Sequence, residues 1–213
     1  MINVIVAYDH LDLVLGQYFN NAYLNIHHEI SLNPLINMHS FDSDTCHLDN
    51  ISGQIATFNE SPFIFIALSH GKEDSLIIKN GSYEYVSIDT AYFFASSLFY
   101  SISCDSGKIL GKKLIEQNCS AFIGYTHKIE LFSALENVYM DCENYAIKQF
   151  LQTDQDIYTC FEEMILFYKN AEKKLKKQGL VFASIQLGSN RRSLSFEGNK
   201  NLVQSDFKRN VLA

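Results

Sequence analysis

Two apolar runs that each end in a polar, glycine-containing turn most constrain the fold of this chain. Residues 63–68 (Phe-Ile-Phe-Ile-Ala-Leu) lead into 69–71 (Ser-His-Gly), and residues 98–102 (Leu-Phe-Tyr-Ser-Ile) lead into 103–107 (Ser-Cys-Asp-Ser-Gly). Short apolar runs are typical of strands that are buried on both faces in a parallel sheet. Ligands of open α/β sheets bind beyond the carboxyl ends of such strands. The sequence therefore predicts an imidazole and a thiol at one edge of a sheet.

Length and composition favour one folded domain. The chain has 213 residues, of which 47% are hydrophobic and 19% are charged, and these fractions are typical of globular proteins. It contains only 2 prolines and 10 glycines, so we expect no long flexible linker. We therefore interpret residues 1–213 as a single domain with one large core.

The charge of the chain argues against several classes of partner. The formal net charge is −7 and the isoelectric point is about 5.4, whereas nucleic-acid binding requires a concentrated basic face. The one dense basic run, residues 173–177, falls at the end of a predicted helix, where the helix dipole favours cations. The chain start has no basic leader region, and no apolar stretch approaches the ~20 residues that span a bilayer. We expect no direct nucleic-acid partner and no membrane partner.

The cysteines and histidines give no sign of a disulfide framework or a metal site. The 5 cysteines are odd in number and lack Cys-x-x-Cys spacing, which favours a reducing, cytoplasmic location. His27-His28-Glu29 lacks the i, i+4 spacing of zinc ligands, and Cys46-His47 are adjacent with no partner pair. No glycine-rich phosphate loop or dinucleotide fingerprint is present in the sequence. We expect no metal and no cofactor.

The first two thirds of the chain alternate between strand and helix patterns. This alternation predicts an α/β fold with a mainly parallel central sheet and helices on both faces, in three α/β/α layers. Asn80-Gly81 between alternating β-formers predicts a small hairpin inserted after the His-Gly strand, and Asp9 is the expected cap of the first helix. The predicted elements are strands at 2–7, 63–68, 98–103 and 120–125, helices at 11–29, 51–58, 91–95 and 108–118, and the hairpin at 76–86.

The last third of the chain is expected to be more helical. Apolar residues at helical spacing predict helices over 134–151 and 154–178, and Gly179 stands where a C-cap belongs. Residues 180–187 are rich in β-formers and predict a final long strand. Residues 192–197 predict a short hairpin at the edge of the sheet.

Cys104 and His70 form a candidate nucleophile and general base. A thiol becomes a strong nucleophile when a neighbouring imidazole removes its proton. Cys104 precedes the predicted helix at 108–118, so we expect it beside a helix N-terminus, which favours the thiolate. The backbone amides of Gly71 and Cys104 could form an oxyanion hole, and the missing Cβ of Gly71 would let a substrate carbonyl approach. A lone cysteine is usually buried and inert, so the prediction depends on the pairing of the two strand ends.

These motifs, in this order, resemble the caspase-like cysteine peptidases, which include caspases, metacaspases, gingipain-type enzymes, separases and CHAT-domain proteases. The shared pattern is a strand that ends in His-Gly, here 65–71, and a later strand that ends in Cys and small residues, here 100–107. The resemblance implies a caspase-like fold, with His70 as the general base and Cys104 as the nucleophile.

The CHAT branch is the most similar part of this clan. Its members follow the Cys turn with a helix and a strand, here 119–124, and then add two helices. They end in a strand and hairpin, which residues 183–198 resemble. The resemblance covers about residues 62–198, and the part before it is compatible but carries no motif.

Three further residues are candidates for the substrate pocket. Relatives that cut after basic residues carry an Asp two positions before the nucleophile, and Ile102 occupies that position here. Because an apolar side chain cannot pair with Lys or Arg, the resemblance predicts no preference for a basic P1 residue. Asp105 adjoins the nucleophile, and His127 follows the strand at 120–125, so both are expected to line the cleft. A solvated loop histidine is the alternative interpretation of His127.

The resemblance implies a cysteine endopeptidase that cleaves a partner protein. CHAT-like proteases of this kind act in bacterial antiphage and cell-suicide systems, where the substrate is an effector such as a pore-forming protein. No fused regulatory domain is expected, so control would come from a separate activator or sensor protein, or from assembly. Two alternatives stay open. One is a catalytically silent caspase-like binding or scaffold module, and the other is a thiol-dependent acyl transferase or amidase in which His70 is incidental.

Overall fold

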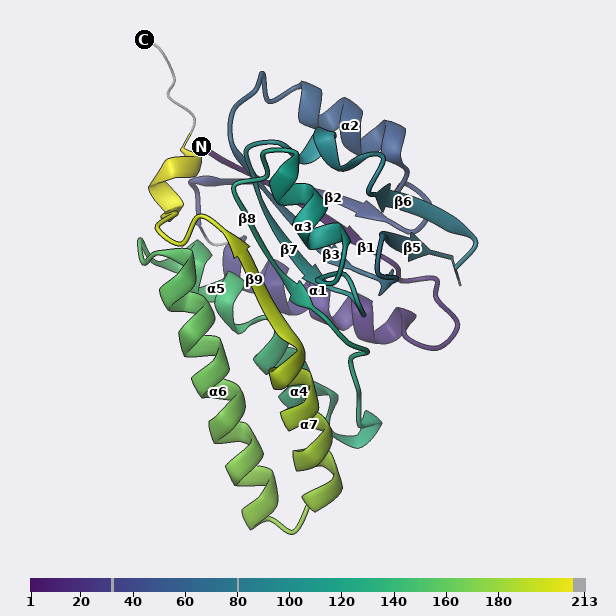
Figure 1. Cartoon of the computed structure of the whole chain (residues 1–213), viewed down its shortest axis with the longest axis vertical. Helices are drawn as coiled ribbons and strands as arrows, with labels where there is room; N and C mark the ends of the chain where they lie inside the picture. Colours follow the sequence, from purple (N-terminus) through teal and green to yellow (C-terminus); the bar gives the residue numbers. More distant parts are fainter. Residues whose placement is uncertain (32, 80, 209–213) are drawn as a thin grey trace.

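A six-stranded sheet forms the centre of the protein (Figure 1). The computed structural model describes residues 1–31, 33–79 and 81–208. The strand order is β2-β1-β3-β7-β8-β9, and every neighbouring pair is parallel except β8 with β9. The strands are β1 (Ile2–Tyr8), β2 (Ile36–Asp42), β3 (Phe63–Leu68), β7 (Ser97–Ile102), β8 (Ala121–Tyr125) and β9 (Leu194–Gly198).

The central strands are buried on both faces, as their uninterrupted apolar runs predict. Every residue of β3, β7 and β8 is buried. Alternate side chains of β3 enter different cores: Ile64 and Ile66 join one cluster, whereas Phe63 and Phe65 join the other. Two cores on opposite faces of one sheet confirm the predicted α/β arrangement in three layers.

Helices cover both faces of this sheet. One core is closed by α1 (Gly16–Ile30), α4 (Glu136–Glu143), α5 (Tyr145–Gln152), α6 (Ile157–Lys177) and α7 (Val181–Ser193). The other core is closed by α2 (Leu48–Ala56), α3 (Leu110–Glu116) and the 3-10 turn η1 (Ala91–Phe94). Two further 3-10 turns are η2 (Ser133–Leu135) and η3 (Gln204–Phe207).

A second, small sheet follows β3, where a hairpin insertion is predicted. It contains β4 (His70–Gly71), β5 (Ser75–Ile78) and β6 (Tyr83–Ser87) in antiparallel order. The hairpin prediction is confirmed, although Asn80 of the expected turn lies outside the described residues. The structure adds β4, which places the His-Gly pair within the same small sheet.

The prediction of a strand over residues 180–187 is wrong, because residues 181–187 lie in α7 and Leu180 directly precedes this helix. Within it, Ala183 and Leu187 are buried at helical spacing against the core, whereas Phe182 and Ile185 are exposed. The sheet position beside β8 is taken by β9, which pairs with it over the full length of both strands. Tertiary packing thus overrides the β-propensity of the segment.

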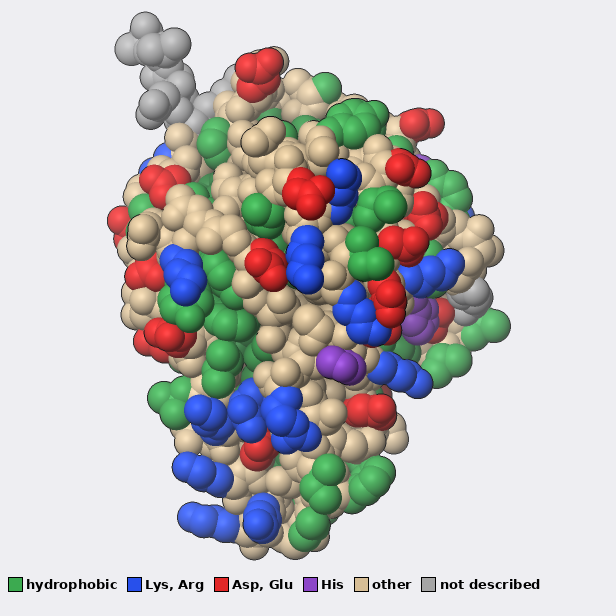
Figure 2. Space-filling model, in the orientation of Figure 1, with side chains coloured by type: hydrophobic (Ala, Val, Ile, Leu, Met, Phe, Trp, Pro, Cys, Tyr) green, Lys and Arg blue, Asp and Glu red, His purple; other side chains and the backbone are tan. Residues whose placement is uncertain are grey.

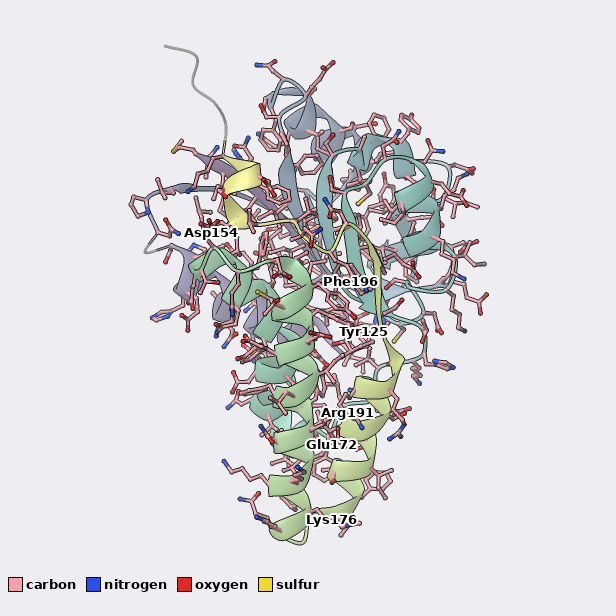
Figure 3. The ribbon with its side chains drawn as sticks, turned by 60° about the vertical axis from the view of Figure 1, so that its left-hand side comes forward. Tyr125, Asp154, Glu172, Lys176, Arg191 and Phe196 are labelled. Carbon is pink, nitrogen blue, oxygen red and sulfur yellow. The ribbon has the colours of Figure 1, made fainter. Side chains whose placement is uncertain are left out.

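The two C-terminal helices form a hairpin that extends beyond the sheet (Figures 1 and 3). Gly179 at the turn has a φ of +79°, as expected for a helix C-cap. Glu172 on α6 and Arg191 on α7 face one another in Figure 3, and they form an ion pair. The predicted hairpin at 192–197 is a single strand, β9, which continues directly from α7.

Several helix boundaries differ from the sequence predictions. The first helix begins at Gly16 rather than at residue 11, and Asp9 does not cap it. The Asp9 carboxylate instead accepts hydrogen bonds from Ser43 Oγ at 2.6 Å and from the Lys79 amide at 2.8 Å. The segment at 91–95 forms only a 3-10 turn, the helix at 108–118 is shortened to α3, and the helix at 134–151 is divided into η2, α4 and α5.

The basic run at 173–177 lies at the C-terminal end of α6, as predicted. Lys174, Lys176 and Lys177 are in its last turn. Figure 2 shows Lys and Arg side chains gathered over the part of the molecule where α6 lies in Figure 1. In the described part of the chain, no helix has both the length and the apolar character needed to cross a membrane.

The packing of α3 on β8 requires a residue without a side chain at Gly111. A Cβ there would lie 2.6 Å from two ring atoms of Phe122, which is fully buried. We expect Gly111→Ala to lower the free energy of unfolding by about 1–3 kcal/mol, because the ring must shift in a close-packed core. Gly53→Ala in α2 is the matched control, since its Cβ meets nothing within 4 Å. Denaturant titration should show that control to be equal to or more stable than the parent.

Candidate active site

His70 and Cys104 follow two strands that pair directly. β3 and β7 are parallel neighbours in register, with Leu68 opposite Ile102. One residue further on, Ser69 Oγ and Ser103 Oγ lie 3.5 Å apart. The structure therefore brings the predicted imidazole and thiol to the same edge of the sheet, and both residues line one cavity.

This cavity is narrow and mostly apolar. Its free volume is about 30 Å³, enough for one or two water molecules. It lies on the face of the sheet that α1 and α4 cover. The lining residues are Leu15, Tyr18, Phe19, Ser69, His70, Ile102, Ser103, Cys104, Ile129, Leu131 and Glu143.

Asp12 holds the His70 ring and is a site residue that the sequence analysis missed. Asp12 Oδ2 and His70 Nε2 are 2.9 Å apart. The other carboxylate oxygen, Oδ1, accepts hydrogen bonds from the amides of Val14 at 2.9 Å and Leu15 at 2.7 Å. Asp12 is almost fully buried, and burial raises its pKa. The two amides and the His70 charge outweigh this effect, so the pKa of Asp12 is lowered and its carboxylate is kept ionised.

The orientation of His70 leaves one ring nitrogen for chemistry. Nε2 is engaged by Asp12, and the ring packs edge-on against Phe19 with centroids 5.6 Å apart. A carboxylate on one nitrogen fixes the tautomer and the ring plane, so that the other nitrogen, Nδ1, can exchange a proton. A carboxylate-held imidazole is one feature of a general base.

Gly71 allows the two loops to come close together. A Cβ on Gly71 would lie 2.3 Å from the carbonyl oxygen of Cys104 and 2.9 Å from Cβ of Ser103. The missing Cβ thus makes room for the backbone of Cys104, and not for a substrate carbonyl as the sequence predicts. The Lys72 amide donates a hydrogen bond to the Ser75 carbonyl at 2.8 Å. Hydrogen-bonded and non-hydrogen-bonded residue pairs alternate along an antiparallel ladder, so the neighbouring pair, Gly71 and Leu76, is not hydrogen-bonded. The Gly71 amide therefore points away from β5. The oxyanion-hole role of the Gly71 and Cys104 amides stays a prediction.

The turn after Cys104 differs from the expected helix start. Residues 103–109 form turns, and α3 begins only at Leu110, so the prediction of a helix N-terminus beside Cys104 is wrong. Asp105, directly after the thiol, has a φ of +59°, a conformation that is costly for a residue other than glycine. The Cys104 turn is therefore a sharp, strained bend.

In this conformation Cys104 favours the neutral thiol. Its Sγ accepts a hydrogen bond from the Ile129 amide at 3.2 Å. Burial raises the pKa of Cys104, and the neighbouring Asp105 charge adds to that rise, while the Ile129 hydrogen bond lowers it in part. A base must therefore remove the proton before Cys104 can act as a nucleophile.

Asp105 and His127 lie outside the cavity that His70 and Cys104 share. The Asp105 carboxylate is 2.8 Å from Lys108 Nζ, which also binds Glu73. His127 is exposed, and its ring contacts the Thr126 hydroxyl at 3.0 Å. Of the three predicted pocket residues, the structure places only Ile102 in the lining.

Glu143 is a second lining residue that the sequence analysis missed. It lies at the end of α4, is fully buried, and accepts a hydrogen bond from the Tyr18 hydroxyl on Oε2. Burial raises its pKa to about 8, and the Tyr18 hydrogen bond opposes the rise only in part. The sequence contains a signal for this residue: Glu143 follows Cys142 on the apolar face of the predicted helix at 134–151. A carboxyl group on such a face indicates a buried, functional position.

Within the described residues, no group of three or more His, Cys, Asp or Glu side chains is placed to hold a metal ion. No family model matches the chain, and no curated protein matches it.

The pKa of Glu143 makes stability depend on pH. Since the folded pKa, about 8, exceeds the ordinary value of 4.5, the folded state binds a proton that the unfolded state releases. The stabilisation is present in full below pH 4.5 and is lost as the pH rises through about 8. We expect this slope to approach about 1.4 kcal/mol per pH unit within that window. Glu143→Gln should flatten it, as measured by denaturant titration at several pH values, whereas Asp141→Asn on the exposed side of α4 should not.

Proposed function

We propose that the protein is a cysteine endopeptidase that uses Cys104 as nucleophile and His70 as general base. The observation that carries this proposal is the shared cavity of the two residues at the ends of the paired strands β3 and β7. Asp12 on His70 Nε2 completes a carboxylate–imidazole–thiol series, an arrangement used in nucleophilic catalysis on many unrelated folds.

The chemistry follows from these three side chains. His70 takes the proton of Cys104, and the sulfur attacks the scissile carbonyl carbon, whose oxygen gains the negative charge. The amide C–N bond then breaks, and the imidazolium returns its proton to the departing amine. Water, activated by His70, hydrolyses the thioester and regenerates the thiol. Asp12 stabilises the imidazolium during both steps.

The narrow cavity supports a regulated enzyme. About 30 Å³ of free space does not admit a peptide side chain, and the partly buried Cys104 thiol is protonated in this conformation. Turnover then requires the walls to open, and a separate activator or sensor protein, or assembly, would raise the fraction of open molecules. Brief opening of the isolated chain is enough for an irreversible probe to react slowly with Cys104. The chain order of the His and Cys motifs supports a caspase-like enzyme of CHAT type. On that basis we propose that it cleaves a partner protein, such as a pore-forming effector, in a bacterial antiphage or cell-suicide system.

A peptidyl electrophile tests the nucleophile and the base together. Cys104 is partly exposed, whereas Cys46, Cys119, Cys142 and Cys160 are buried, so an affinity probe should alkylate Cys104 alone. We expect His70→Ala to slow this alkylation by at least about 10²-fold, because proton transfer in catalysis contributes that much. Intact-mass spectrometry with peptide mapping measures both the rate and the position.

The controls separate the remaining alternatives. His28→Ala, at an exposed position of α1, should leave the rate unchanged. A scaffold module would show no directed alkylation, and a Cys104→Ala variant would keep its biological activity. An acyl transferase or amidase with an incidental His70 would show alkylation that His70→Ala does not slow.

Asp12→Asn tests the positioning role of the carboxylate. Asn keeps an acceptor for the Val14 and Leu15 amides, so the turn should persist, but it removes the charge that balances the imidazolium. We expect alkylation of Cys104 to slow by roughly 10²-fold, with unfolding free energy changed by less than ~1 kcal/mol. A purely structural role for Asp12 would instead lower the unfolding free energy and leave the rate of the folded protein unaltered. Asp44→Asn, at an exposed carboxylate, is the matched control.

A further inference from the structure

Glu143 lines the cavity that Cys104 and His70 share, and one of its carboxyl oxygens makes no hydrogen bond to the described residues. Its Oε2 accepts from Tyr18, and its backbone carbonyl accepts from the Tyr100 hydroxyl at 2.5 Å. Oε1 is buried and has no hydrogen-bond partner among the described residues. A buried polar atom left unpaired costs about 1–3 kcal/mol, so a ligand that pairs with it gains affinity and specificity. Because Glu143 lines the same cavity as Cys104 and His70, such a ligand would be part of the substrate.

The walls of the cavity limit the shape of that ligand. Leu15, Phe19, Ile102, Ile129 and Leu131 give it apolar sides, and its free volume is about 30 Å³. A β-branched or aromatic side chain would have to displace several walls, whereas a chain that is unbranched up to its tip needs the least widening. The occupant that fits is a narrow chain with a polar tip.

The charge state of Glu143 indicates what that tip carries. Burial raises the pKa of Glu143 to about 8, so the carboxyl is mostly neutral near pH 7. A neutral carboxyl both donates and accepts hydrogen bonds, and a primary amide does the same. An ammonium group would require ionisation of a carboxyl that is surrounded by Tyr18 and Tyr100 and has little access to water.

We propose that Glu143 forms the closed end of the S1 pocket and selects a glutamine side chain at P1. This inference rests on the proposed peptidase function and deepens it. The glutamine methylenes lie along the apolar walls, and the amide pairs with Glu143 Oε1. An uncharged P1 residue also agrees with the expectation drawn from Ile102.

The test compares irreversible peptidyl probes that are identical except at P1, which is glutamine, norleucine, lysine or glutamate. The rate of Cys104 alkylation in the full chain is measured by intact-mass spectrometry. We expect the glutamine probe to react at least about tenfold faster than norleucine, which has the chain but no polar tip. Glu143→Met should abolish that ratio, whereas Glu143→Gln, which keeps an acceptor and a donor, should retain it. Asp141→Asn, exposed on the same helix, should leave the ratio unchanged.

Each contrary result has a distinct meaning. Equal rates with glutamine and norleucine in the parent protein overturn the selection of an amide, and this comparison does not depend on how any variant folds. A lysine preference that Glu143→Gln removes shows an ionised carboxylate and overturns the proposed P1 residue. If the probes alkylate Cys104 at rates independent of P1, only this inference fails. If no probe alkylates Cys104, the peptidase function itself fails.

Discussion

The parallel pairing of β3 with β7 is the interaction on which the candidate site depends. It sets Leu68 opposite Ile102, so the residues that follow each strand, His70 and Cys104, emerge at the same edge. The missing Cβ of Gly71 then lets the two loops touch, because any larger residue would collide with the Cys104 carbonyl. β1 pairs on the other side of β3, and the loop after β1 delivers Asp12 to the imidazole.

Two buried carboxyl groups near this edge show how position decides chemistry. Asp12 accepts hydrogen bonds from two backbone amides and adjoins His70, so its pKa falls and it carries a charge. Glu143 has one tyrosine hydroxyl as partner, and burial raises its pKa to about 8. The first is suited to orient and balance an imidazolium, and the second to offer a neutral hydrogen-bonding surface.

The sequence predicted those features that depend on local pattern and chain order. The apolar runs before His70 and Cys104 identified β3 and β7, and the alternation of elements predicted their adjacency. Residues 180–187 were misassigned, because β-formers there lie on a helix whose packing against α6 no local propensity reveals. Asp12 and Glu143 reach the site from other elements, 58 residues from His70 in the case of Asp12, so only the folded chain brings them together.

The segment between β8 and α4 links the thiol to the helical hairpin. The Ile129 amide donates a hydrogen bond to Cys104 Sγ. The adjacent Glu130 amide donates to Asn190 Oδ1 on α7 at 2.8 Å, and Asn190 Nδ2 donates to the Glu130 carbonyl at 2.7 Å. Ile129 and Leu131 are also walls of the cavity. A displacement of α7 would therefore move both the cavity wall and the amide that contacts the sulfur. The hairpin of α6 and α7 extends beyond the sheet (Figure 1), and a few hydrogen bonds connect it to the Cys104 thiol, which must lose its proton.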